Sequence, residues 1–239
     1  IDRFDDTAVI QPNAAWADVL LPELVTALAE VTGVTTILKN AGGRGRALEG
    51  LDDVDAVLMG DMPDAPIAVE MNGATYIADL VSGQKTGLFF DQRPNHAFAA
   101  SLAQGARVLD VFSHVGGFGL AALAGGAASA LCVDGSEAAL ALAEFDLVVC
   151  DPPAFAPSHK ARDAGLRAYE RIARLATPLV SEDGYLVLCS CSHAANLSAF
   201  TGACLRGIGR AGRRAQLLHT GTAGPDHPLM PQLAESGYL

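Results

Sequence analysis

A glycine-rich turn within residues 108–119 is the feature that most constrains this chain, because it joins an apolar run to an Ala/Leu-rich run. A second predicted strand ends at Val133-Asp134, and a third ends at Asp151-Pro152-Pro153. The carboxyl ends of parallel strands meet at one edge of an open α/β sheet, where such sheets bind nucleoside-bearing ligands. The sequence therefore predicts an α/β fold with a Rossmann-like, doubly wound sheet and a cofactor site at these strand ends.

The charges at these strand ends indicate which cofactor fits. The turn lacks the G-x-G-x-x-G spacing of dinucleotide sites. Asp110 beside it would repel a pyrophosphate but could hold an ammonium group, and Asp134 can accept hydrogen bonds from ribose hydroxyls. These groups favour S-adenosylmethionine, a cation without phosphate. The alternative is an ordinary strand–turn–helix unit that binds no ligand.

Composition narrows the protein class. Of the 239 residues, 50% are hydrophobic, enough for one large domain or two small ones. No apolar run is as long as a membrane span, and the charged start is not a signal peptide, so a cytoplasmic protein without a membrane partner is expected. Because the chain does not start with Met, we expect it to be a fragment. The 5 cysteines are an odd number with no zinc-site spacing, which favours free thiols and no bound metal.

The net charge of −11 argues against non-specific nucleic-acid binding by the whole chain. The charge is uneven, however, because Arg206, Arg210, Arg213 and Arg214 gather near the C-terminal end. They form either a local basic surface or a solvated helix face, and the sequence leaves both readings open.

Periodicity and turn signals predict two domains, residues 1–78 and residues 79–239. The first is a small α+β unit. A strand is expected at 4–11, a helix at 16–31 and a second strand at 35–39. A charged, flexible loop is expected at 42–46, and a hairpin with Asn72-Gly73 at its turn is expected at 67–78. The second alternates strands and helices, as α/β sheets do. Beyond the glycine turn its elements are expected at 145–150, 166–177, 185–189 and 197–207, and a helix at 96–102 precedes it.

One spacing is short for such a sheet. Asp134 and Asp151 are 17 positions apart, and a helix at 136–143 and the strand at 145–150 fill that interval. A doubly wound sheet normally has another strand and helix here, about 17 residues at mean element lengths. Residues are therefore expected to be missing from the sequence near 143–145.

Several motifs in this order resemble class I S-adenosylmethionine-dependent methyltransferases. More closely, they resemble the ribosomal RNA large-subunit cytosine-C5 methyltransferase family, whose members combine PUA, EEHEE and Rossmann-like domains. The segments that match are 1–4, 83–87 with 91–93, 108–119, 151–155, 190–192 and 226–228. The resemblance implies that the chain starts at the EEHEE domain, that a PUA domain is absent from it, and that its partner is RNA, expected to be ribosomal.

The resemblance also implies a nucleophile at Cys191, within Ser190-Cys191-Ser192. A thiolate that adds to C6 of cytosine makes C5 able to attack a methyl sulfonium. Asp151 would share the N3 proton. Cys189 is a rival thiol, two residues earlier on the expected strand, and both cysteines are alternatively small buried hydrophobes.

The other implied site residues bind cofactor or substrate. Those on the cofactor side are Lys85, Thr86, Phe89, Gln92, Asp110, Phe112, Ser113, Gly116, Gly117, Asp134, Ser136, Asp151 and Pro153. Those on the substrate side are Phe155, which would stack on an extruded base, Lys160 and His227. Residues 85–93 form either a flap over the cofactor or a surface hairpin, and Ala154 stands where the family often has lysine.

Two other functions fit the same sequence. Asp151-Pro152-Pro153 resembles a motif that binds exocyclic amines, and this alternative would methylate a base amine without a cysteine. The second alternative is a non-catalytic module that binds RNA or cofactor. The oligomeric state is not determined by the sequence, and a homodimer is one candidate.

Overall fold

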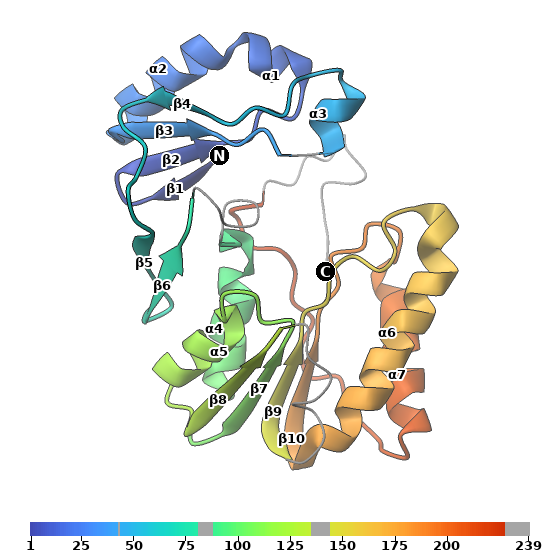
Figure 1. The fold of residues 1–239 in the computed structure, drawn as a ribbon. Helices are drawn as coiled ribbons and strands as arrows, with labels where there is room; N and C mark the ends of the chain where they lie inside the picture. The colour runs from blue at the N-terminus through green and yellow to red at the C-terminus, as the bar shows by residue number, and fades with distance from the viewer. Residues whose placement is uncertain (43, 81–87, 135–143, 228–239) are drawn as a thin grey trace. The chain divides into compact units, whose positions relative to one another are not determined.

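The computed structural model describes residues 1–42, 44–80, 88–134 and 144–227 (Figure 1). The chain forms two compact units. Residues 1–70 with 75–89 make the first, and residues 71–74 with those described from Phe90 onward make the second. The expected division between residues 78 and 79 stays a prediction.

The first unit is built around a four-stranded sheet in the order β1-β2-β3-β4, in which only β2 and β3 run parallel. Two strands, the helices α1 and α2, and two further strands follow the expected EEHEE order, with the short helix α3 added between the last two strands. The elements are β1 (Asp2–Phe4), β2 (Thr7–Ile10), α1 (Ala15–Val19), α2 (Leu21–Thr32), β3 (Thr36–Lys39), α3 (Arg44–Leu48) and β4 (Ala56–Met59).

Three expectations for this unit are corrected. The strand expected at 4–11 is divided by a turn with Asp5 at φ 54°, so that β1 and β2 pair antiparallel. The helix expected at 16–31 is two helices, because Pro22 favours a new helix start. The loop at 42–46 was expected to be flexible, but its second half begins α3, where Arg46 is 1% exposed and bonded to Asp18 and Asp52.

The hairpin signal at Asn72-Gly73 is confirmed. β5 (Ile67–Met71) and β6 (Ala74–Ala78) form a two-stranded sheet. Asn72 has φ 52° and Gly73 has φ 76°, and a type I′ turn needs both residues in this left-handed region. The Asn72 side chain also donates to the Arg93 carbonyl at 3.0 Å, so the hairpin tip belongs to the second unit.

The second unit is an α/β layer structure with a fully parallel sheet in the order β10-β9-β7-β8. Successive residues of β7 point to opposite faces: Val108 packs with the core under α4 and α5, and Leu109 packs on the α6 side (Figure 1). The strands are β7 (Arg107–Val111), β8 (Ser129–Val133), β9 (Phe145–Cys150) and β10 (Val180–Leu188). The helices are α4 (Arg93–Ser101), α5 (Gly117–Ala124), α6 (Arg162–Ala176) and α7 (Leu197–Arg210), with short 3-10 turns η1 (Phe90–Gln92), η3 (His159–Ala161) and η4 (Thr177–Leu179).

This arrangement confirms the expected Rossmann-like sheet.

The longest described helix, α6, has 15 residues, and within the described ranges no helix has both the length and the apolar character needed to cross a membrane. β8 pairs only with β7 among the described strands. The helix expected at 136–143 lies outside the described residues, and the missing segment near 143–145 stays a prediction.

The α6–α7 contact gives a stability test with a matched control. A Cβ atom at Gly207 would overlap the Glu170 carbonyl oxygen and lie 2.8 Å from the Ala173 Cβ, whereas one at Gly209 would meet no atom of the described residues within 4 Å. We expect Gly207→Ala to destabilise the protein by about 1–3 kcal/mol through overpacking. Gly209→Ala should stabilise it by up to about 1 kcal/mol, because alanine favours helix.

The measurement is the urea midpoint followed by circular dichroism. The single tryptophan, Trp16, is in the first unit, so its fluorescence would not report α6 and α7. Equal shifts for the two variants would contradict the close α6–α7 contact.

Candidate functional site

Backbone hydrogen bonds join the carboxyl ends of the four parallel strands. The Phe112 N–H donates to the Val133 carbonyl at 2.8 Å, and the Asp151 N–H donates to the Val111 carbonyl at 3.2 Å. The Cys189 N–H donates to the Cys150 carbonyl at 2.9 Å, which joins the end of β10 to the end of β9. The sheet therefore gathers at one edge the segments that carry Asp110, Asp134, Asp151 and Cys191.

The glycine turn has an unusual backbone. Phe112 and His114 have φ values of 64° and 48°, and Gly116, which precedes α5, has φ 82°. Left-handed conformations at residues other than glycine cost energy and are enriched at ligand sites. A Cβ atom at Gly119 would overlap the Cys132 sulfur, so this glycine lets α5 approach β8 closely.

Asp110 lies beneath this turn with one carboxylate oxygen unpaired. Its Oδ2 accepts from the Gly119 N–H at 2.9 Å, but Oδ1 is buried and has no hydrogen-bond partner among the residues that the structure describes. Asp110 is 1% exposed. Burial raises the pKa of Asp110 to about 7, and the charges of Asp151 and Asp134 contribute in the same direction. A buried carboxylate oxygen without a donor suits a cationic ligand, so the site fits the ammonium group of S-adenosylmethionine.

The neighbouring groups differ in their access to solvent. Asp134 directly follows β8 and is exposed. Its carboxylate is therefore accessible to the ribose hydroxyls of a ligand. Ser113 is buried, Gly117 is half-buried, and the Ser113 N–H donates to the Val133 carbonyl at 3.2 Å. Ser136 lies outside the described residues.

His96 is a neighbour of the turn that the sequence analysis missed. A Cβ atom at Gly117 would lie 2.8 Å from its ring, and its ring meets Phe118 edge-on with centroids 4.5 Å apart. Burial lowers the pKa of His96 to about 4, so the imidazole is neutral at physiological pH. No local pattern distinguishes this histidine from any other on a helix, because only packing places it under the turn.

Cys191 and Asp151 occupy adjacent strand ends. The Cys191 Sγ lies 3.9 Å from the Pro152 carbonyl oxygen, within the range of a weak S–H hydrogen bond. Burial raises the pKa of Asp151 to about 6, with a further contribution from the charge of Asp91. A carboxyl group that titrates near neutral pH can both accept and return a proton.

The rival thiols are in different surroundings. The strand β10 ends at Leu188, one residue before Cys189, where the sequence predicted its end. Cys189 packs against the core beneath α4 and α5. Burial raises the pKa of Cys189 well above that of an ordinary thiol, and it raises the pKa of Cys150 to about 12. Both therefore remain protonated thiols. Cys189 and Cys191 are both half-buried, and Cys191 is the one whose sulfur contacts the Pro152 carbonyl.

The segments at 91–93 and 226–227 are tied together. Arg93 forms an ion pair with Asp226, and the His227 Nδ1 lies 3.3 Å from the Asp91 Oδ2. Gln92 is buried, and its Oε1 accepts from the Asn95 side chain at 2.9 Å. Asp91, which raises the pKa of Asp151, is therefore held by the loop that carries His227.

The remaining predicted residues divide by position. Phe155 is half-buried with its ring centroid 5.1 Å from that of Tyr169, while Pro153 and Lys160 are exposed. Phe89 is exposed and belongs to the first unit, and Lys85 and Thr86 lie outside the described residues. In the described part of the chain, no group of three His, Cys, Asp or Glu side chains is arranged to hold a metal ion.

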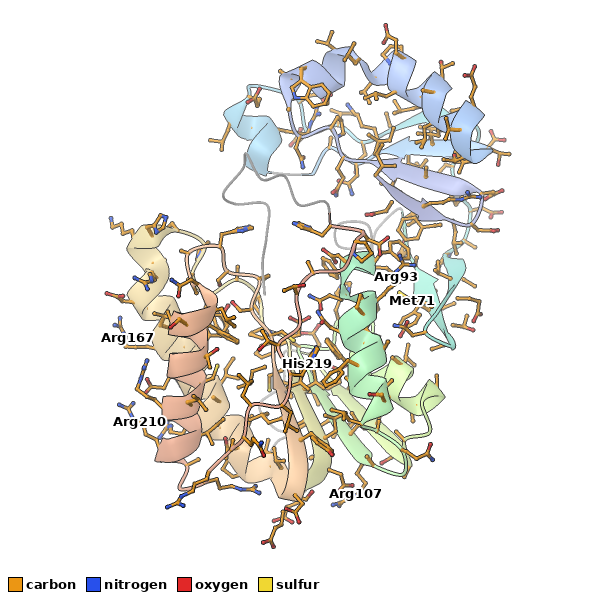
Figure 2. All side chains as sticks on the ribbon, turned by 180° about the vertical axis from the view of Figure 1, so that it is seen from behind. Met71, Arg93, Arg107, Arg167, Arg210 and His219 are labelled. Atoms are coloured by element: carbon orange, nitrogen blue, oxygen red, sulfur yellow. The ribbon has the colours of Figure 1, made fainter. Side chains whose placement is uncertain are left out.

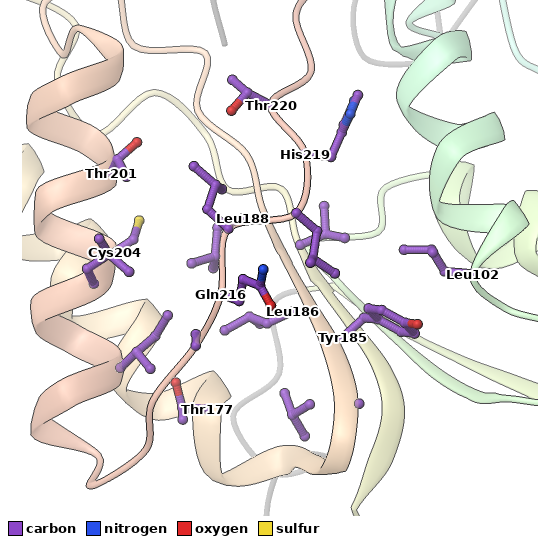
Figure 3. A pocket seen from close by; sticks show the side chains of 18 of the residues that line it. Leu102, Thr177, Tyr185, Leu186, Leu188, Thr201, Cys204, Gln216, His219 and Thr220 are labelled. Carbon is purple, nitrogen blue, oxygen red and sulfur yellow. The ribbon is translucent and has the colours of Figure 1, made fainter.

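A pocket of about 600 Å³ lies elsewhere in the second unit, beside β10 (Figure 3). Leu186 and Leu188 of β10, Cys204 of α7 and His219 of the segment after α7 line it. Its lining does not include the acids at the strand ends or Cys191. The pocket is therefore distinct from the site described above.

Comparisons with known proteins agree with this geometry. Residues 43–143 match a family model described as S-adenosylmethionine-dependent methyltransferase. Ribosomal RNA large subunit methyltransferase I of Tolumonas auensis is 33% identical over 273 positions, covering 100% of this chain and 69% of the relative. The protein of the same name from Aeromonas hydrophila subsp. hydrophila is 32% identical with the same coverage. SMU.776, a methyltransferase structure complexed with SAH, has the same fold, with a TM-score of 0.78, 21% identity and coverage of 98% of this chain and 68% of that one.

The parallel sheet, the glycine turn over Asp110 and the matching family model define an S-adenosylmethionine-dependent methyltransferase. The resemblance expected from the motifs is confirmed over the whole chain. The chain belongs to the ribosomal RNA large subunit methyltransferase I family. This membership sets aside the non-catalytic alternative.

Proposed function

We propose that this chain methylates C5 of a cytosine in ribosomal RNA through a covalent adduct with Cys191. The observation that carries the proposal is the position of the Cys191 sulfur, 3.9 Å from the carbonyl oxygen of Pro152, which directly follows Asp151 in the sequence. The name of the relatives, ribosomal RNA large subunit methyltransferase I, supports ribosomal RNA as the substrate. A cytoplasmic location stays a prediction.

The proposed roles follow from the chemistry of cytosine. C5 is a poor nucleophile, and addition of the Cys191 sulfur to C6 gives C5 the electron density to form a new carbon–carbon bond. Bound S-adenosylmethionine would supply an electrophilic methyl group, and its methyl–sulfur bond would break to leave S-adenosylhomocysteine. Removal of the C5 proton by a base and cleavage of the C6–sulfur bond restore the aromatic ring and free Cys191.

Asp151 serves the same reaction from the next strand. Addition of sulfur at C6 places negative charge on the ring that protonation at N3 relieves. With its pKa raised to about 6, Asp151 can hold that proton and take it back when the adduct breaks. Asp110 holds the cofactor ammonium, and Asp134 accepts from the ribose hydroxyls.

Methylation of an exocyclic base amine is a second candidate. Asp151 and the Pro152 carbonyl lie side by side at the strand ends and would accept the two amine protons. This chemistry needs no thiol, so the proximity of Cys191 would be incidental.

Transfer of label to RNA tests the choice between them. Total RNA from cells that lack the protein is incubated with the chain and S-adenosylmethionine labelled in the methyl group, and the RNA is then digested to nucleosides. We expect label in 5-methylcytidine. Label in an N-methylated nucleoside would overturn the C5 proposal in favour of amine methylation.

The arginines near the C-terminal end are largely engaged in structural contacts. Glu170 of α6 pairs with Arg206, at 3.0 Å, and with Arg210. Arg213 donates to the carbonyls of Thr177, Val180 and Ser181. Of the two readings left open by the sequence, the solvated helix face fits Arg206 and Arg210, whose side chains are 57% and 67% exposed on α7. Arg213 instead bonds η4 and the start of β10.

Three further arginines of α6 are better placed for RNA. Arg167, Arg171 and Arg174 follow each other at helical spacing and are all exposed. Figure 2 shows Arg167 and Arg210 on the outer side of the α6–α7 pair. We propose that the face formed by Arg167, Arg171 and Arg174 contacts phosphates of the RNA. This local positive charge would allow binding although the chain as a whole is acidic.

The triple variant Arg167→Gln, Arg171→Gln, Arg174→Gln is expected to bind RNA more weakly. The slope of log affinity against log salt should fall by about 0.7 for each phosphate that the variant no longer neutralises. Filter binding over a salt series measures both quantities. The control is Arg107→Gln, at an exposed arginine that begins β7 and so lies at the end of the strand away from the site. An equal loss of RNA affinity in the two variants would contradict the proposal.

A further inference from the structure

The residues before and after Cys191 in the sequence are both serines, and their buried hydroxyl groups belong to one hydrogen-bonded network. Ser190 and Ser192 are 1% and 4% exposed, and both contact the hydroxyl of Tyr169, which is 2% exposed. The Ser190 hydroxyl donates to the Tyr169 oxygen at 2.9 Å, and the Tyr169 and Ser192 oxygens are 2.7 Å apart. One phenol therefore binds both neighbours of the thiol.

The donors and acceptors of this network determine the direction of its hydrogen bonds. Because Ser190 donates to Tyr169, the single proton of the phenol is available for Ser192. Burial raises the pKa of Tyr169, so the phenol keeps that proton. The Ser192 N–H in turn donates to the Ser190 oxygen at 3.3 Å, which closes a ring of polar contacts around Cys191.

The same network reaches the loop that follows β9. The Ala156 N–H donates to the Ser192 oxygen at 2.9 Å, so Ser192 connects the Cys191 segment to the loop of Asp151 and Pro152. The Tyr169 ring is fixed by Phe155 on one side and by Phe200, which it meets edge-on with centroids 5.0 Å apart, on another. α6 thus anchors both segments of the proposed site through one residue.

We propose that Tyr169 is a positioning residue for Cys191, which holds the thiol in register with the Asp151 loop through Ser190 and Ser192. The inference rests on the proposed role of Cys191 as nucleophile. Tyr169 itself is proposed to touch neither the cofactor nor the reacting atoms. Its hydroxyl keeps the sulfur against the Pro152 carbonyl, in the place from which it would reach C6 of the base.

Tyr169→Phe removes the hydroxyl and keeps the ring that packs on Phe155 and Phe200. We expect kcat for methyl transfer to fall roughly ten- to a hundredfold, because a small displacement of a reacting group is costly. The KM for S-adenosylmethionine should stay within about twofold, since Asp110 bonds the Gly119 N–H and Gly117 packs near His96, on the other side of the sheet from α6. Tyr185→Phe, on β10 and at the pocket distinct from the site, is the matched control and should change neither constant.

A second measurement follows the thiol without RNA. The chain is treated with iodoacetamide, and the alkylation of each cysteine is measured by peptide mass spectrometry, with the exposed Cys132 as internal reference. In Tyr169→Phe we expect the rate at Cys191 relative to Cys132 to rise severalfold, because a loosened segment releases the sulfur from Pro152. A core residue without a positioning role would leave this ratio unchanged.

The outcomes separate this inference from the proposed function. Because two buried serine hydroxyls lose their partner, the variant should melt at a lower temperature, so both assays are run well below its unfolding transition. A lower kcat with a higher Cys191 alkylation ratio then supports positioning. An unchanged kcat or an unchanged alkylation ratio overturns it, as does a fall in kcat accompanied by an equal rise in the cofactor KM. If Cys191→Ala keeps full transfer, the C5 proposal fails, while the alkylation ratio still reports whether Tyr169 holds the thiol.

A double variant adds an independent check. Ser192→Ala breaks the same bridge, so Tyr169→Phe combined with Ser192→Ala should lower kcat little further than either change alone. Fully multiplicative losses would mean that the two hydroxyls act separately, and this would overturn the network.

Discussion

Cys191→Ala is expected to abolish 5-methylcytidine formation, with a loss of at least about 10⁴-fold in kcat, as is typical when a covalent nucleophile is removed. Cofactor affinity should be unchanged, because the groups that fit S-adenosylmethionine are on β7 and β8. The measurements are label transfer to RNA with nucleoside analysis and calorimetric titration of the cofactor. Cys191→Ser should lose activity as well, because a serine hydroxyl is not ionised near neutral pH.

Cys189→Ala is the matched control for this experiment. Cys189 is two residues away, but it packs into the core and burial raises its pKa, so it is a protonated thiol. We expect its replacement to leave kcat within about twofold, at a modest cost in stability from the small cavity. Transfer to C5 that survives in Cys191→Ala would contradict the adduct, and transfer to an amine that survives would identify the second candidate.

Asp110→Asn is expected to weaken S-adenosylmethionine binding by roughly ten- to a hundredfold, the range for removal of a charged hydrogen bond. The variant keeps the shape of the side chain and an oxygen for the Gly119 N–H, but it removes the negative charge. Asp134→Asn is the control at an exposed position: it should also lower affinity, but it keeps Asp110 and therefore keeps the pH dependence described next.

The pH dependence follows from the pKa of Asp110, which burial raises to about 7. Only the ionised carboxyl holds an ammonium group, so affinity for the cofactor should fall about tenfold between pH 8 and pH 6 in the wild-type chain. The slope should be absent in Asp110→Asn. Because the pKa of Asp151 is about 6, Asp151→Asn measured over the same range shows how much of the slope belongs to that second carboxyl.

Stability without cofactor should depend on pH in a corresponding way. The folded chain binds a proton at Asp110 more tightly than the unfolded chain, whose carboxyl has an ordinary pKa near 4. The free energy of unfolding therefore decreases as pH rises from about 4 to about 7, and Asp110→Asn should lose this part of the decrease. Urea unfolding at several pH values measures the difference, and identical slopes in the two proteins would contradict the burial of a charge at Asp110.

Most elements of the fold could be predicted because their signals are local. Asn72-Gly73 specifies its hairpin by backbone conformation alone, and the apolar run before Gly116 specifies β7. The segment at 42–46 was misread for the opposite reason. Its charges suggested a solvated loop, whereas Arg46 is buried by bonds to Asp18 and to Pro12, which are 28 and 34 residues away in sequence.

The sequence by itself determined the strand ends that meet at the site and the residue types that they carry, because strand periodicity, a glycine turn and Asp-Pro-Pro act over a few neighbouring residues. Only the tertiary structure decided how those residues behave. The unpaired oxygen of Asp110, the neutral His96 beneath the turn and the protonated Cys189 all follow from burial by other elements. The link from Tyr169 to Ser190, Ser192 and Ala156 joins residues 21 to 36 positions apart, and contacts at that separation exist only once α6 has packed on the sheet.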